Sequence, residues 1–213
     1  MFYPKKVVVD QSFKGVKKCL NSEKELEDFC SIDYFFYGMF NAEFEGLENF
    51  PSNKIKSAQC TFMHTGPNPD IEYSQYNPYC STLDLRGFNQ DKLENIFGMF
   101  CESNYTDVLY KDNFGCNAKN IGRLFLNSRM LTHVDLSGID TDKLDVETYG
   151  PSCYVDAVAG LRRINSFKVG DNWNMTMESV GFEDESNIWV DYRGNPYSTK
   201  NFPEPNVLYK DAK

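Results

Sequence analysis

Two short stretches of the chain alternate apolar and polar residues. Leu83 and Leu85 flank Asp84, and Val134 and Leu136 flank Asp135. Alternation with a period of two puts the apolar side chains on one face of a β-strand and the polar side chains on the other. A glycine, Gly87 or Gly138, follows each stretch and predicts the turn that leaves the strand.

The two stretches belong to one repeated segment. When Val134 is aligned with Leu83, an offset of 51 residues, six of eleven positions are identical. A middle copy at an offset of 25 from Leu83 begins at Val108. A period of 20–29 residues with L-x-L strands marks leucine-rich repeats. We therefore expect Leu83–Leu85, Val108–Tyr110 and Val134–Leu136 to be neighbouring parallel strands.

A second apolar pattern follows each strand with the spacing of a helix. Leu93, Ile96, Phe97 and Phe100 recur three and four residues apart, which predicts a short helix or turn behind the strand. The same rhythm recurs along the chain, at 34–40, 55–65 and 118–128. Phe62 and Phe100 are 38 residues apart, and an insertion rich in Pro and Tyr accounts for the excess over one repeat.

These patterns predict a single domain with an α/β solenoid fold, in three parts. Residues 1–33 form an N-terminal cap, with a strand in the segment "KKVVVD" and a helix after the capping box of Ser22 and Glu25. Residues 34–170 hold about five degenerate repeats with the insertion at 66–80. Residues 171–213 form a C-terminal cap whose last residues, "KDAK", should fray.

The charge of the chain bears on its partners. The net charge is −9, and residues 1–18 carry five Lys against one Asp. An acidic surface repels phosphate backbones, so we expect no direct binding of nucleic acid. It attracts a basic protein surface, although acidic faces also serve solubility alone. The sequence shows no apolar run long enough for a membrane span or a secretory signal, which predicts a cytoplasmic protein, or a cell-surface one if the chain is a fragment.

Residues suited to catalysis or metal binding are few. The seven cysteines form no C-x-x-C pair, which predicts reduced, buried thiols and no zinc site. His133 and Asp107 are predicted neighbours and form a conceivable catalytic pair, but a surface histidine in a strand is the simpler interpretation. Asp84, Asp107 and Asp135 should stack as a row of carboxylates about 5 Å apart. We predict no cofactor and no metal.

The predicted binding site combines the outward strand positions with the insertion. Tyrosine gives contact area at low entropic cost, so the tyrosines of the insertion either contact a partner or pack on the solenoid. The residues expected to meet a protein partner are Asp84, Arg86, Asp107, Lys111, His133, Asp135, Tyr73, Tyr76 and Tyr79.

Two segments carry a resemblance to a known family. "LTHVDLSGIDTDKL" (131–144) and "LENIFGMFC" (93–101) resemble the BspA-like leucine-rich repeats of bacterial surface proteins, and "NIWVDYRGNPYST" (187–199) is similar to the segment that closes such arrays. The resemblance covers about 35–199, with 145–160 departing from the pattern. It implies a right-handed solenoid that binds other proteins and has no known catalysis.

The charge and size of the chain refine this functional hypothesis. A small acidic member without an export signal fits a protein of a phage or mobile element, or an immunity-type protein, that inhibits a basic partner by masking it. The alternatives are a fragment of a surface adhesin that binds host proteins and, last, an enzyme that uses His133 and Asp107.

Overall fold

The computed structural model describes residues 4–12, 31–50, 54–67 and 81–182, together with three short strands near the C-terminus. Nine strands, four 3-10 helices and one α-helix are found in these described parts. The strands are β1 (Lys6–Val8), β2 (Glu43–Glu45), β3 (Thr82–Asp84), β4 (Asp107–Leu109), β5 (His133–Leu136), β6 (Ser166–Val169), β7 (Trp189–Val190), β8 (Pro196–Tyr197) and β9 (Val207–Lys210). The helices are η3 (Leu47–Asn49), η7 (Thr141–Lys143), α1 (Val146–Tyr149), η8 (Gly150–Cys153) and η9 (Glu178–Val180).

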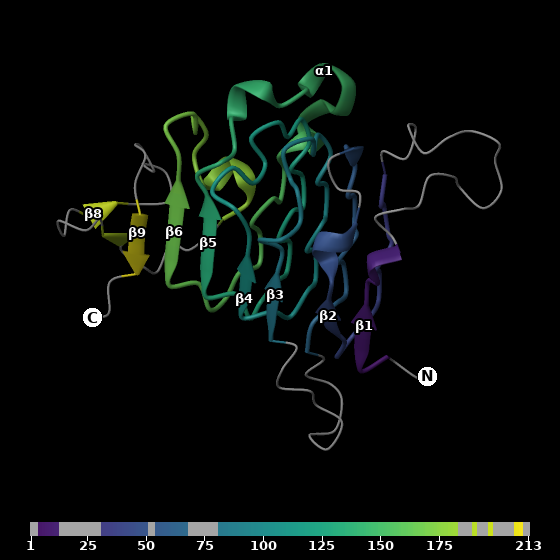
Figure 1. The fold of residues 1–213 in the computed structure, drawn as a ribbon. Helices are drawn as coiled ribbons and strands as arrows, with labels where there is room; N and C mark the ends of the chain where they lie inside the picture. Colours follow the sequence, from purple (N-terminus) through teal and green to yellow (C-terminus); the bar gives the residue numbers. More distant parts are fainter. Residues whose placement is uncertain are drawn as a thin grey trace.

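The first six strands follow one another side by side with the same direction (Figure 1). They form three hydrogen-bonded parallel pairs, β1–β2, β3–β4 and β5–β6. In the second pair Leu83 is aligned with Val108, so the predicted offset of 25 residues is confirmed. The predicted pairing of the β4 segment with β5 is only partly correct. The Thr132 amide donates to the Thr106 carbonyl at 3.1 Å, but β4 and β5 belong to different sheets.

The C-terminal strands extend the last pair in the opposite direction. β9 is antiparallel to β6 and also pairs with β7, which pairs with β8. The sequence pattern did not predict these antiparallel strands. The expectation that the end of the chain frays is wrong at Lys210, which belongs to β9. An antiparallel neighbour occupies the edge of β6, which an array of parallel strands would leave unpaired.

Behind the strands lies a stack of turns, which we call the turn ladder. Its five members are residues 31–41, 57–66, 95–104, 120–129 and 153–160. The segments consist mainly of turns and contain no α-helix, so the short helix or turn predicted over 93–100 is a run of turns. Four or five backbone hydrogen bonds of 2.7–3.1 Å join each member to the next, such as those from Phe62 N–H to the Met99 carbonyl and from Phe100 N–H to the Leu124 carbonyl.

Aromatic rings stack along the inside of the turn ladder. Phe36, Phe62, Phe100 and Phe125 follow one another with ring centroids 5.2, 6.1 and 5.1 Å apart and interplanar angles of 24° or less. All four residues are buried. The column shows that Phe62 and Phe100 are equivalent positions despite their 38-residue spacing, as the sequence predicted. Leucines and valines of the strands, Leu83 and Val134 among them, close the other side of this core.

Gly87 and Gly138 lie in the turns that leave β3 and β5, as expected, but not because of a left-handed backbone. Neither has a positive φ, so neither is needed for a left-handed turn. A Cβ at Gly87 would lie 2.9 Å from the Cβ of Glu48, and a Cβ at Gly138 would lie 2.4 Å from the carbonyl oxygen of Phe114. These glycines therefore allow successive segments to approach closely.

The parallel pairs and the turn ladder are consistent with the predicted repeats, while the right-handed leucine-rich-repeat class stays a prediction. The helix expected after Ser22 lies outside the described residues. Within the described residues, Cys60, Cys101, Cys116 and Cys153 form no disulfide, and the reduced state of the thiols stays a prediction.

Candidate functional site

The outward face of the strands is arranged as the alternation predicts. In β3, Leu83 is buried and its neighbours Thr82 and Asp84 are exposed. In β5, Val134 and Leu136 are buried while His133 is exposed and Asp135 is partly exposed. Arg86 and Lys111, which follow β3 and β4, are also exposed. Tyr73, Tyr76 and Tyr79 lie outside the described residues.

The predicted row of stacked carboxylates is wrong. The register of the β3–β4 pair aligns Asp84 with Leu109, and aligns Asp107 with Thr82. Asp84 and Asp107 are therefore two positions apart along the strands, so a half-exposed leucine lies beside Asp84. The 25-residue offset already implied this alignment, because residue 25 positions after Asp84 is Leu109 and not Asp107.

Asp84 is held by the arginine that follows its strand. Arg86 donates from Nε to Oδ1 of Asp84 at 3.0 Å and from Nη2 to Oδ2 at 2.6 Å, and its backbone N–H donates to Oδ1 at 3.0 Å. These hydrogen bonds lower the pKa of Asp84, with the side chain of Arg86 as the largest cause. The pair is therefore ionised at neutral pH, and Arg86 is not a free cation.

The other predicted site residues contact different partners from those expected. Asp135 forms an ion pair with Lys168 of β6 at 3.0 Å. Asp107 accepts hydrogen bonds from the hydroxyls of Thr106 and Thr132, at 3.0 and 3.4 Å. His133 Nδ1 lies 2.7 Å from the hydroxyl oxygen of Ser166.

No hydrogen bond or ion pair joins His133 to Asp107 among the described residues. The geometry therefore gives no support to the alternative of a catalytic pair. In the same part of the chain, no cluster of three or more metal-ligating side chains is present.

Between β4 and β5 the sheet is interrupted, and a tyrosine hydroxyl takes the place of the missing strand-to-strand hydrogen bonds. The register of β5 with β6 turns the backbone groups of Val134 and Leu136 toward β6, so those of the intervening Asp135 point toward β4. There they meet the side chain of Tyr110. Its hydroxyl accepts from the Asp135 N–H at 3.1 Å and donates to the Asp135 carbonyl at 2.6 Å. Burial raises the pKa of Tyr110. The hydroxyl thus replaces the missing main-chain neighbour.

A second interruption lies between β2 and β3. Glu43 N–H donates to the Lys5 carbonyl and the Glu45 carbonyl accepts from Val9, so these two residues direct their backbone groups at β1. The groups of the intervening Phe44 must point the other way, toward β3. By the same argument, the bond from Leu85 N–H to the Leu109 carbonyl leaves the groups of Asp84 pointing toward β2.

Across this boundary the facing strand edges are not joined. Within the described ranges, no backbone hydrogen bond links β2 with β3, whereas the turns behind these strands are hydrogen-bonded to each other. Phe44, Thr82 and Asp84 therefore present main-chain donors and acceptors to the space between the strands. Backbone groups of this kind find either water or another chain as a partner.

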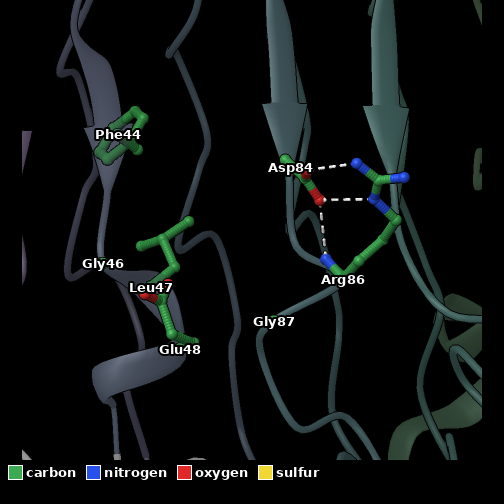
Figure 2. Close-up of a pocket in the computed structure, with 7 residues that line it drawn as sticks. All are labelled: Phe44, Gly46, Leu47, Glu48, Asp84, Arg86 and Gly87. Atoms are coloured by element: carbon green, nitrogen blue, oxygen red, sulfur yellow. Dashed lines mark hydrogen bonds and ion pairs between the residues drawn. The ribbon is translucent and has the colours of Figure 1, made fainter.

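A groove of about 480 Å³ opens at this boundary. Figure 2 shows Glu48 on one side and the Asp84–Arg86 pair on the other, with the side chain of Arg86 directed away from Glu48. Close contact of Gly87 with Glu48 brings the two segments together at one end of the groove. The lining residues are Phe44, Gly46, Leu47, Glu48, Asp84, Arg86 and Gly87.

Sequence reasoning found two of these lining residues, Asp84 and Arg86, and missed the others. A signal for them was present. Gly46 and Leu47 follow β2 as Gly87 and Phe88 follow β3, so the segment "FEGL" repeats the end of the segment "LDLRGF". An alignment of the two would have placed both sides of the groove next to each other.

The face as a whole carries less excess charge than the acidic chain suggests. Three of its carboxylates are paired with cations from the same face, in the pairs Lys6–Glu45, Arg86–Asp84 and Lys168–Asp135. Glu43 and Asp107 have no ion pair within the described residues. Exposed pairs of this kind contribute little energy but fix the charge pattern that a partner meets.

Comparison of the chain with protein-family models, curated protein sequences and solved structures finds no match. In the described part of the chain, no helix has the length and apolar composition needed to cross a membrane.

Proposed function

We propose that this protein is a non-enzymatic interaction module that binds another protein through the outward face of its strands and the β2–β3 groove. The observation that carries the proposal is the unjoined boundary, where Phe44, Thr82 and Asp84 direct backbone groups into the space between β2 and β3, beside a groove lined by charged side chains. A partner's main chain can satisfy such groups, as happens when an extended peptide binds the edge of a sheet.

The charge pattern supports a partner with a modestly basic surface. Glu43 and Asp107 form no ion pair with a described residue, although Lys6 of β1 is aligned with Glu43, and Glu48 lines the groove. A basic side chain of a partner could form an ion pair with any of these carboxylates. An inhibitor or immunity-type role, in which the chain masks a basic surface of its partner, extends the same proposal.

Photo-crosslinking from defined positions tests the proposal. A benzophenone amino acid is placed at Thr82 or at Leu109, which occupy outward positions on β3 and β4, and in the control at Val146, which is 49% exposed on α1. After irradiation in the native host, the two strand positions should yield the same crosslinked protein and Val146 should not. A protein captured equally from all three positions would contradict binding at the strand face.

Charge variants of the purified chain then test the mechanism with that partner. Thr82→Arg together with Leu109→Arg adds bulk and positive charge to the face, and should weaken binding at least tenfold. Asp171→Arg, an exposed position beyond β6, is the matched control and should leave affinity unchanged. Equal weakening by both variants would show that only the net charge matters, against a site on the strands.

A further inference from the structure

A second pocket lies on the other side of the core, among the stacked turns. Its volume is about 290 Å³. This is near the lower end of the range for small-molecule sites and suits one large side chain better than a cofactor. The lining residues are Tyr34, Tyr37, Cys60, Met63, Phe97, Gly98, Cys101 and Arg123.

The register of the turn ladder explains why these residues meet. Tyr34, Cys60, Gly98 and Arg123 occupy equivalent positions in four successive turns, and all four have a positive φ between 52° and 59°. Equivalent positions in hydrogen-bonded neighbours lie about 5 Å apart. Gly98 has no side chain where the others do, so a hollow is left between Cys60 and Arg123.

The rim of the pocket is aromatic and exposed. Tyr34 and Tyr37 are 52% and 48% exposed, and their ring centroids lie 6.0 Å apart. The Tyr34 hydroxyl accepts a hydrogen bond from Nε2 of Gln59 at 3.0 Å, which fixes the ring beside the hollow. Tyrosine is one of the residue types enriched among those that dominate the energy of protein interfaces.

The floor of the pocket is neutral at physiological pH. Burial raises the pKa of the Cys60 thiol and raises that of Cys101 to about 12. Both thiols therefore stay protonated and contribute apolar surface. Arg123 is the only residue of the lining with a formal charge at neutral pH.

Among the described residues Arg123 forms no ion pair, not even with Asp156, which occupies the equivalent position in the next turn. Its guanidinium carbon lies 5.8 Å from the centroid of the Phe97 ring. Arg86 on the opposite face, in contrast, is paired with Asp84. An arginine held over an aromatic ring, with its donors available, is suited to bind a carboxylate through two parallel hydrogen bonds.

We propose that this pocket receives a peptide segment of a partner protein in which an apolar side chain lies next to an aspartate or glutamate. The apolar side chain enters the hollow above Gly98, between the tyrosines and Phe97, and the carboxylate pairs with Arg123. This site is independent of the strand face, so either can exist without the other.

Capped dipeptides test the chemistry directly on the intact chain. Acetyl-Phe-Asp-amide is titrated while the Met63 methyl and the Arg123 Nε–H signals are followed by NMR. A fragment of this size should bind with a Kd on the order of millimolar. Acetyl-Phe-Asn-amide lacks the charge, acetyl-Ala-Asp-amide lacks the ring, and each should bind at least tenfold more weakly. Equal shifts with the Asn dipeptide, or shifts spread outside the pocket, would overturn the proposal.

Variants of the chain provide the second arm. Arg123→Gln should reduce binding of the Phe-Asp dipeptide at least tenfold, while Arg129→Gln, at an exposed arginine of the same turn outside the pocket, should not. Gly98→Asn fills the hollow with a residue that tolerates a positive φ and should abolish binding. Equal effects of the two arginine variants would overturn the proposal. If Arg123→Gln fails to fold, the comparison of dipeptides on the unmodified chain decides.

Discussion

The two sides of the core differ in how completely their backbones are joined. On the turn side, hydrogen bonds connect every neighbouring pair of segments from residues 31–41 to residues 153–160, and Val158 N–H continues to the Val180 carbonyl. On the strand side, the pairs β1–β2, β3–β4 and β5–β6 are separated by two interruptions. The same segments therefore stack regularly at one side and irregularly at the other.

The two interruptions also differ from each other. Between β4 and β5 the hydroxyl of Tyr110 satisfies both backbone groups of Asp135, so the boundary is closed. Between β2 and β3 no described side chain takes this role and a groove remains. The turn ladder thus provides a rigid frame that keeps the strands in order, and the strand side is free to vary and to form a site.

Hydrogen exchange should show the largest difference between the two sides. The amides of Thr82 and Asp84 face the groove and should exchange rapidly, whereas those of Phe62 and Phe100 donate within the turn ladder. Amides that open only on global unfolding are protected according to its free energy, so we expect at least a thousand-fold difference in rate. Leu85, which donates to Leu109, is the control within the same segment and should be protected. Slow exchange at Thr82 and Asp84 would mean that the boundary is closed.

Truncation of the phenylalanine column should give the largest loss of stability by a single substitution. Phe100 is fully buried between Phe62 and Phe125, and Phe100→Ala should lower the free energy of unfolding by about 3–5 kcal/mol. On the strand side, Leu136→Ala should cost about 2–5 kcal/mol. Urea denaturation measures both. A smaller loss for Phe100→Ala than for Leu136→Ala would contradict the view that the turn ladder is the frame.

Removal of one hydroxyl tests the closed boundary. Tyr110→Phe leaves the N–H and the carbonyl of Asp135 without their partner, and should destabilise the protein by about 1–3 kcal/mol. Tyr34→Phe is the matched control, since that hydroxyl is exposed and its loss should change stability by less than about 0.5 kcal/mol. Equal effects of the two variants in urea denaturation would show that the Tyr110 hydroxyl does not replace a strand neighbour.

Much of the regular part of this fold could be predicted from the sequence. The offset of 25 residues gave the alignment of Leu83 with Val108, and the recurring pattern gave the equivalence of Phe62 with Phe100. These positions are buried, and burial restricts them to apolar residues that recur visibly. The β9 strand had no such signal, because nothing in the repeat marks an antiparallel neighbour for its last member.

The candidate site could be predicted only in part. Alternation placed Asp84 and His133 on the outward face, but which side chains they contact depends on register and on residues from other segments, such as Ser166. The groove exists because β2 and β3 are not hydrogen-bonded to each other. No pattern of residues in the sequence marks such an unpaired boundary. Tyr110 was assigned to a buried strand position, although its hydroxyl is what holds the neighbouring segment.

The smallest expected effect concerns an ion-pair network at the start of the turn ladder. Glu94 lies between Lys56, at 3.4 Å, and Lys119, at 2.8 Å, which belong to the segments before and after it. The hydrogen bond from Lys119 is the largest cause that lowers the pKa of Glu94. A carboxyl with a lowered pKa adds stability above its unfolded pKa of about 4.3, and this contribution is lost as the pH falls through the folded value.

Because the network is partly exposed, Glu94→Gln should cost about 0.5 kcal/mol or less at pH 7. The difference from the unmodified protein should be smaller at pH 3 than at pH 7, because this contribution is lost as the carboxyl becomes protonated. Urea denaturation at the two pH values, with Glu147→Gln at an exposed carboxylate as the control, measures this change. A difference that persists at pH 3 would show that the loss in Glu94→Gln does not come from the charge of the carboxylate, in which case the ion pairs add nothing to the continuity of the turn ladder.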